Sequence, residues 1–224
     1  MTMKTIIQIC LLAFVLITLQ NCCSIYYFDD IDPACSPGHL SPIGAIDVSK
    51  FNEGGEYGNS SGESTIGFQL GVDFIIPVND QVSAETGLRL ARKGSKSSFG
   101  DADYSFEDKV LSTYVDIPLL ARYKIGQKGF SVYGGLQPSV LLGAKRKSKV
   151  DGSSSSQKVT DQYKTLDLAG SIGVGYQLDN GIKLNLGYDH GFVNISKNND
   201  FGGSKINNRT FKLMVGYVLP NKRQ

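Results

Sequence analysis

The feature that most constrains this chain is an alternation of apolar and polar residues that begins near residue 39 and continues almost to the end. Ile66 and Phe68 fall on one face of an extended chain, for example, and Gly67 and Gln69 fall on the other. Successive side chains of a β-strand point to opposite faces, whereas a helix repeats every 3.6 residues, so the pattern predicts strands. We expect strands near residues 40–49, 65–76, 82–90, 111–124, 130–144, 164–178, 182–195 and 208–219. Many of these runs have the length of about 9–11 residues that a tilted membrane-spanning strand requires.

The connections between these predicted strands alternate in length. Three have the composition of tight turns and occupy residues 77–80, 126–129 and 179–181. The other four are long and polar and lie near residues 50–64, 95–108, 145–163 and 197–207. Short turns at one end and long loops at the other are typical of outer-membrane barrels. The sequence therefore predicts an all-β fold, an eight-stranded antiparallel up-and-down transmembrane β-barrel with short periplasmic turns and long outer loops.

The polar face of the predicted strands is rich in glycine and in charges of both signs. Strand positions that face water normally avoid glycine, whereas the narrow interior of a barrel favours small residues. Five acids nearly balance four bases on this face, which suits an interior of paired charges. We expect the barrel-interior charges to be Asp73, Glu85, Arg89, Asp116, Arg122, Asp167, Lys183, Asp189 and Lys212. Eight strands enclose a lumen that side chains fill, so an open channel is not expected.

Outward-facing aromatic residues are predicted at the short-turn ends of the strands. Tyr123, Phe130, Tyr176 and Tyr217 fall there if the chain begins on the periplasmic side. Aromatic side chains at this level would form the girdle that borders the apolar band of a membrane barrel.

Composition excludes several other classes of function. The net charge is +2 with 20% charged residues, which argues against a nucleic-acid-binding protein. No stretch after the N-terminal segment reaches the roughly 18 apolar residues that a membrane helix needs. The two histidines, His39 and His190, stand far apart and no Cys-x-x-Cys pair occurs, so neither a metal site nor a cofactor is expected.

The first residues have the pattern of a secretory signal peptide. Lys4 precedes an apolar run over residues 6–19, which is too short to remain as a comfortable membrane anchor. We expect a signal peptide over residues 1–23, a short periplasmic segment over 24–38, the barrel over 39–219 and a tail over 220–224. The segment ending at Cys22 is similar to a lipobox, so Cys22 is a candidate for lipidation, with ordinary cleavage near Ser24 as the alternative. In an oxidising periplasm Cys35 would pair with Cys22 or Cys23, or remain free.

Three successive segments carry a resemblance to a known family. They are GLRLARKGSK over residues 87–96, YVDIPLLARYK over 114–124 and VYGGLQPSVLL over 132–142. This succession resembles the PorT-like outer-membrane β-barrel family, with its acidic-Ile-Pro-Leu strand, and the likeness covers about residues 39–219. It departs from the family at Gln137, where many members have glycine. The resemblance implies an outer-membrane, non-enzymatic barrel. Some members act in protein secretion or gliding, but no motif here selects that role.

Two prolines, Pro118 and Pro138, fall inside predicted strands. Proline removes a donor from the hydrogen-bond ladder, so we expect a bulge or a bend at each position.

These observations leave three candidate functions. The first is a non-enzymatic outer-membrane barrel that serves as envelope structure or binds an unknown protein partner through its outer loops. In this arrangement the basic run of Lys145, Arg146, Lys147 and Lys149 would contact outer-membrane lipid or the phosphates of lipopolysaccharide. The second is a membrane-embedded lipid-modifying enzyme, which would need His190 with an orienting carboxylate and a serine. The third is a soluble, secreted lipocalin-like barrel that binds an apolar ligand.

Overall fold

A computed structural model describes residues 38–55, 58–61, 63–101, 104–126, 128–150, 153–197 and 205–220. Its strands are β1 (His39–Gly55), β2 (Gly58–Ser61), β3 (Glu63–Pro77), β4 (Val82–Asp101), β5 (Tyr104–Asp116), β6 (Leu119–Ile125), β7 (Phe130–Val150), β8 (Ser153–Lys158), β9 (Leu166–Gln177), β10 (Ile182–Gly191) and β11 (Lys205–Tyr217). A short 3₁₀ helix, η1 (Thr160–Gln162), precedes β9. Within these ranges, no helix combines the length and the apolar character needed to span a membrane.

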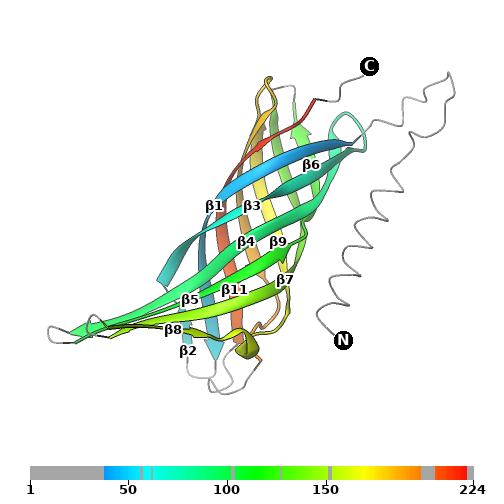
Figure 1. Ribbon diagram of the computed structural model, residues 1–224. Helices are drawn as coiled ribbons and strands as arrows, with labels where there is room; N and C mark the ends of the chain where they lie inside the picture. Colours follow the sequence, from blue (N-terminus) through cyan, green and yellow to red (C-terminus); the bar gives the residue numbers. More distant parts are fainter. Residues whose placement is uncertain are drawn as a thin grey trace, which may run out of the picture.

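The strands form one closed antiparallel barrel (Figure 1). Neighbouring strands follow the order β11-β10-β9-β7-β5-β4-β3-β1, and β11 pairs with β1 to close the ring. β6 continues the line of β5 and pairs with the same two neighbours, β4 and β7. If β5 and β6 are counted as one interrupted strand, the wall has eight strands, which confirms the predicted eight-stranded antiparallel barrel.

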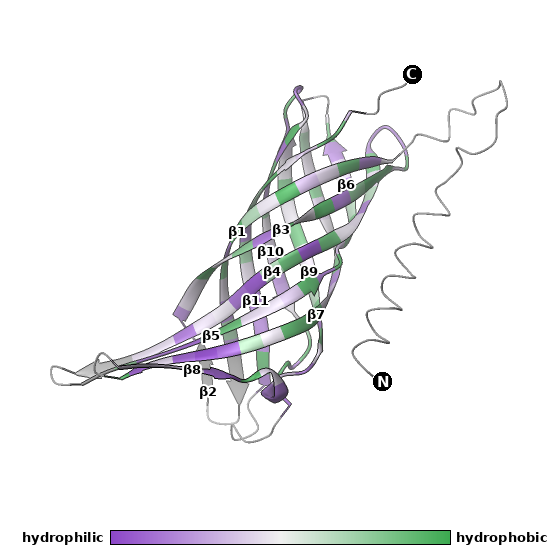
Figure 2. Cartoon of the chain, viewed as in Figure 1, coloured by the Kyte–Doolittle hydropathy of each residue, from purple (hydrophilic) through white to green (hydrophobic). Residues whose placement is uncertain are grey.

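Side chains alternate between a polar interior and an apolar outer surface, as the sequence pattern predicts. In β11, Asn208, Thr210 and Lys212 are buried inside, whereas Phe211 and Leu213 are exposed on the outer wall. Figure 2 shows hydrophobic residues distributed along the barrel wall. A soluble protein would bury such residues, so the inverted pattern fits a wall whose outer face contacts lipid.

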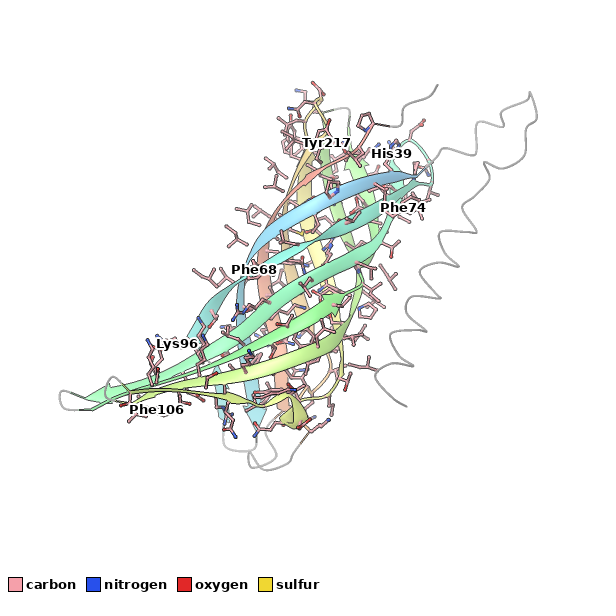
Figure 3. The ribbon with its side chains drawn as sticks, viewed as in Figure 1. His39, Phe68, Phe74, Lys96, Phe106 and Tyr217 are labelled. Carbon is pink, nitrogen blue, oxygen red and sulfur yellow. The ribbon has the colours of Figure 1, made fainter. Side chains whose placement is uncertain are left out.

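The short connections lie together at one end of the barrel, which we call the turn end. Gly126, Gly129 and Gly181 adopt positive φ angles of 63°, 76° and 88°, a conformation that glycine reaches at little cost. In the first turn, the side-chain oxygen of Asn79 accepts hydrogen bonds from the backbone N–H groups of Gln81 (2.9 Å) and Val82 (2.7 Å). His39 and Tyr217 also lie at this end, and Lys96 and Phe106 lie at the other, the loop end (Figure 3).

The long connections contain more β-structure than the sequence suggests. Residues 95–108 were expected to form a loop, but β4 and β5 run through most of them as a hairpin. β7 and β8 form a second hairpin within residues 145–158, and β1 and β2 form a third within 52–61. The hairpins of β4–β5 and β7–β8 pair with each other and project sideways from the loop end (Figure 1). We call this projection, residues 95–101, 104–110, 145–150 and 153–158, the arm.

Neither proline forms a β-bulge. Pro118 separates β5 from β6, but the pairing with β4 keeps one register across it. The pairing of β7 with β9 likewise continues through Pro138 without a shift. The register of β5 against β7 shifts instead between Thr113 and Tyr114, where Leu142 is the extra residue on β7. A bulge, one of the two predicted alternatives, is therefore found at neither proline, whereas the bend stays a prediction. Pro118 does interrupt the strand assignment, since residues 117–118 separate β5 from β6.

Candidate functional site

The nine charged residues predicted to face the barrel interior are all buried there. Most of them belong to three clusters, and each cluster has a member on β4: Glu85, Arg89 or Lys93. These three residues are spaced by four positions along one face of the strand, so the clusters follow one another from the turn end to the loop end.

The cluster nearest the turn end is centred on Glu85. One carboxylate oxygen accepts bonds from Arg122 Nε and from Lys183 Nζ, both at 2.7 Å. The second oxygen accepts a bond from Arg122 Nη2 at 3.1 Å. Arg122 also donates to Ser131 (2.7 Å) and to Asn185 (3.0 Å), so its guanidinium is well satisfied.

The middle cluster is a bidentate ion pair between Arg89 and Asp73. Arg89 Nε and Nη2 each donate to a different carboxylate oxygen of Asp73 at 2.8 Å. Both side chains are only 2% exposed, so each charge depends on the other for its solvation.

The third cluster is a network that joins two carboxylates. Asp116 pairs with Lys93 at 2.9 Å and accepts a bond from Gln137 at 3.0 Å. Gln137 also donates to Asp189 at 3.0 Å, and Asp189 pairs with Lys212 at 2.7 Å. The amide of Gln137 therefore links the two ion pairs across the lumen.

Asp167 lies closer to the loop end and is not part of an ion pair in the described ranges. It accepts a hydrogen bond from Asn208 Nδ2 at 2.7 Å. Two buried charges, Lys93 and Asp47, were not among the predicted interior residues. Both continue the polar face of their strands, and Asp47 lies opposite Lys212 in the β1–β11 register. Extending the alternation by three residues, from Leu90 to Lys93, would have identified Lys93.

An apolar cluster fills the loop end of the lumen, beyond the ion pairs. It combines strand residues with residues from the connections beside η1 and after β10. Its members are Phe51, Val110, Tyr114, Leu141, Ala144, Val159, Tyr163, Ile195 and Ile206. We call this cluster the apolar plug. The sequence analysis did not predict it, because Val159, Tyr163 and Ile206 lie in segments that were expected to be long polar connections, and Ile195 was expected to belong to the wall strand over residues 182–195.

The basic run that was proposed to contact lipopolysaccharide lies on β7, within the arm. Alternation divides it between two faces of the sheet. Arg146 pairs with Asp108 at 3.4 Å, whereas Lys145, Lys147 and Lys149 are exposed on the opposite face. Only the three lysines are therefore available on the face that continues the outer wall.

His190 faces outward from β10, while its neighbour Asp189 points into the lumen. The ring nitrogen Nδ1 of His190 lies 3.4 Å from the hydroxyl of Tyr188, and its ring is 5.8 Å from that of Phe192. Asp189 is engaged with Lys212 and cannot orient the histidine from the other side of the sheet.

Two other sequence hypotheses have no structural description. The proposed signal peptide over residues 1–23, with the lipidation candidate Cys22, and also Cys35, lie outside the described residues. Across the parts of the chain that the structure describes, no group of three or more His, Cys, Asp or Glu side chains is placed to bind a metal ion.

Comparison of the sequence with family models places this chain among outer-membrane proteins. The family model described as "Outer membrane protein beta-barrel domain" matches residues 39–197. No curated protein matches the chain.

Several solved structures are similar to this chain. The attachment invasion locus protein Ail of Yersinia pestis is 18% identical with a TM-score of 0.42, over 81% of this chain and 99% of Ail. Neisserial surface protein A is 13% identical with a TM-score of 0.44, over 80% of this chain and 97% of that protein. OprG of Pseudomonas aeruginosa is 14% identical with a TM-score of 0.38, over 81% of this chain and 95% of OprG.

Proposed function

This chain belongs to the outer membrane protein beta-barrel domain family and lies in the bacterial outer membrane, and we propose that it is a closed, non-enzymatic barrel that binds a partner at its loop end. The observation that carries the proposal is the contrast between the two parts of the molecule. The lumen is occupied by three charge clusters and the apolar plug, whereas the arm presents two paired hairpins beyond the wall.

A filled lumen leaves the loop end as the surface for interaction. The charged side chains of the three clusters bind one another by hydrogen bonds and ion pairs, which leaves them little capacity to bind a solute. The arm is exposed on the face that carries Lys145, Lys147 and Lys149, and regular strands hold these residues in fixed positions. A binding surface on paired strands is more precisely positioned than one on flexible loops.

Two finer identifications belong to this proposal. Within the family, the segments over residues 114–124 and 132–142 favour the PorT-like group. The lysine face of β7 favours contact with outer-leaflet lipid and lipopolysaccharide, whose phosphates attract clustered cations.

The partner proposal is tested by site-specific photocrosslinking in intact cells. A photoreactive residue in place of Ser154, which is exposed on β8 in the arm, is expected to give a discrete protein adduct. The same residue in place of Leu186, which is exposed on the lipid-facing wall, serves as the matched control and is expected to give lipid adducts only. Identical adduct patterns at the two positions would contradict a partner surface on the arm.

Catalysis is the alternative that mutation of His190 tests. We expect His190→Ala to leave the lipid composition of the outer membrane unchanged, because no carboxylate among the described residues orients the ring on its own face of the sheet. Mass spectrometry of lipids from cells that express the wild-type or the variant barrel measures this. Loss of a deacylated or otherwise modified lipid in the variant alone would show that the barrel is an enzyme.

A further inference from the structure

Three positively charged side chains line a hollow on the outer face of the barrel, beside the base of the arm. It has a volume of about 390 Å³ and lies where β4, β5, β7 and the end of β8 meet. Arg92, Lys145 and Lys158 line it, together with the hydroxyl-bearing residues Thr113 and Thr160. No aspartate or glutamate lines it. We call this hollow the cationic pocket.

Strand register brings these residues together from distant parts of the sequence. Arg92 lies opposite Thr113 on β5, and Thr113 lies opposite Gly143 on β7. One step further toward the arm, Lys145 lies opposite Lys158 on β8. Residues directly opposite in antiparallel strands point to the same face, so the three cations share the outer surface.

Hydrogen bonds fix the segment after β8 beside this pocket. The extra residue Leu142 shifts the β5–β7 register immediately before Gly143. After β8, Thr160 Oγ1 accepts a hydrogen bond from the backbone N–H of Ala144 at 3.0 Å, and Val159 N–H donates to Ala144 O at 3.0 Å. These bonds fix η1 against β7 and so position Lys158 and Thr160 over the edge of the hollow.

The positive charge of the pocket is not neutralised by the described residues. None of its three cations has a carboxylate within 4.0 Å in the described ranges, whereas the neighbouring Lys96 pairs with Glu107 at 3.2 Å. Two like charges directly opposite on paired strands destabilise the pairing. The Lys145–Lys158 pair is therefore an arrangement that an anion would stabilise.

The pocket lies at the outer boundary of the apolar band. On β4, the outward-facing Leu88 and Leu90 are exposed, and Arg92 is the next outward residue toward the arm. On β7, the exposed Leu142 itself lines the pocket, as does Leu111 on β5. A ligand in the pocket would thus contact the cationic side chains with an anionic headgroup, and it would contact the apolar side chains of the wall with acyl chains. This is the division of a phospholipid or a phosphorylated glycolipid.

Other positively charged side chains lie at the same height on the barrel wall, just beyond the apolar band. Lys50 on β1 and Arg209 on β11 lie opposite each other, directly beyond the outward-facing Val48 and Phe211. The first charged side chain beyond the apolar band is thus a cation on β1, β4, β7 and β11. A ring of this kind is complementary to the anionic headgroups of an outer leaflet.

We propose that the cationic pocket binds the phosphate group of an outer-leaflet glycolipid of the lipid A type, with Arg92, Lys145 and Lys158 as its ligands and Thr113 as a hydroxyl donor. This inference rests on the proposed function for the orientation of the barrel, with its loop end at the cell surface. It differs from the interpretation of the basic run in its residues: Arg92 and Lys158 come from outside that run, and Arg146 takes no part.

The test is a binding measurement on the full-length mature barrel in nonionic detergent, with fluorescently labelled lipid A as the probe and fluorescence anisotropy as the readout. The triple variant Arg92→Gln, Lys145→Gln, Lys158→Gln is expected to bind at least about tenfold more weakly than the wild type. Lipid A from which the phosphates have been removed is expected to bind both proteins equally weakly. Strong binding of the dephosphorylated lipid to the wild type would overturn the proposal.

The matched control removes the same charge from the same face of the arm. Lys109, Lys147 and Lys149 lie outside the pocket and contribute only the general attraction of the lysine face for anionic headgroups. Their replacement by glutamine is therefore expected to weaken binding by less than about threefold. An equal loss in both triple variants would overturn the pocket in favour of diffuse attraction. Displacement of the probe by inorganic phosphate at the same concentration as unlabelled lipid A would overturn the lipid as the ligand.

A single variant keeps the test decisive if the triple variant does not fold. Lys158→Gln is expected to weaken lipid A binding about threefold and to raise the thermal stability of the lipid-free barrel, since it removes the repulsion from Lys145. A lower stability without lipid would contradict this. Photocrosslinking at Ser154 in the same variant separates the two proposals: the protein adduct is expected to persist when lipid binding is lost.

Discussion

Replacement of Arg89 by methionine is expected to lower the free energy of unfolding by about 3–5 kcal/mol, because it leaves a buried carboxylate without its counterion. Both oxygens of Asp73 accept hydrogen bonds from Arg89 at 2.8 Å. Water cannot replace the guanidinium at this position, since both side chains are 2% exposed. Urea unfolding of the barrel in vesicles, followed by the heat-modifiable migration of folded barrel on gels, measures the loss.

The second half of this prediction concerns the pair as a unit. Adding Asp73→Leu to Arg89→Met removes the unpaired charge and is expected to restore stability to within about 1–2 kcal/mol of the wild type. The control is Lys96→Met on the arm, whose ion pair with Glu107 is 31% and 38% exposed and should contribute no more than about 1 kcal/mol. If Arg89→Met lowers the free energy of unfolding by no more than Lys96→Met does, the buried interior ion pairs do not contribute more to stability than an exposed pair.

The sequence predicts the barrel well because its strongest signal is also the physical rule that governs the fold. Each strand of the wall must present apolar side chains outward and small or charged side chains inward. An alternation with period two satisfies both requirements at once. Ile66 and Phe68 on one face and Gly67 and Gln69 on the other lie in the structure as their spacing predicts. The turn end follows from composition in the same way, because Gly126, Gly129 and Gly181 adopt positive φ angles.

The arm and the cationic pocket could not be predicted from composition, because they depend on register. Residues 95–108 are rich in serine, glycine and charge, which is typical of loops, yet β4 pairs with β5 over most of this range, and Phe106, Glu107 and Asp108 pair in turn with β7. Arg146 is neutralised by Asp108, which is distant in sequence, and Lys145 meets Lys158 across a hairpin whose turn the composition does not locate. A shift of one residue in either pairing would turn these side chains to the other face.

The apolar plug supports the second large prediction, that Ile195→Ala destabilises the barrel by about 2–4 kcal/mol. Ile195 is fully buried, although it lies in the connection after β10. Its backbone is also engaged on both sides, since its N–H donates to Ile206 O at 2.9 Å and its carbonyl accepts from Lys164 N–H at 2.7 Å. Truncation therefore leaves a cavity that strands on opposite sides of the lumen cannot easily close.

The matched control for this variant is Ile172→Ala on the outer wall, where the side chain is 64% exposed. Both substitutions remove the same groups from an apolar environment, but lipid or detergent fills the space at residue 172. The loss of unfolding free energy in Ile172→Ala is therefore expected to be about 1–2 kcal/mol smaller than in Ile195→Ala, because no empty cavity is left at residue 172.

Limited proteolysis adds a readout that locates the change. Lys164 and Lys197 flank the contacts of Ile195, and Lys197 N–H donates to Gln162 O at 2.9 Å. Trypsin cleaves where the backbone opens locally, so Ile195→Ala is expected to speed cleavage at these two lysines while the barrel stays folded. Cleavage at wild-type rates, together with an equal loss of stability in the Ile172→Ala control, would mean that the connections do not close the lumen. The loop end would then be an entrance, and the search for a ligand would return to the interior charges.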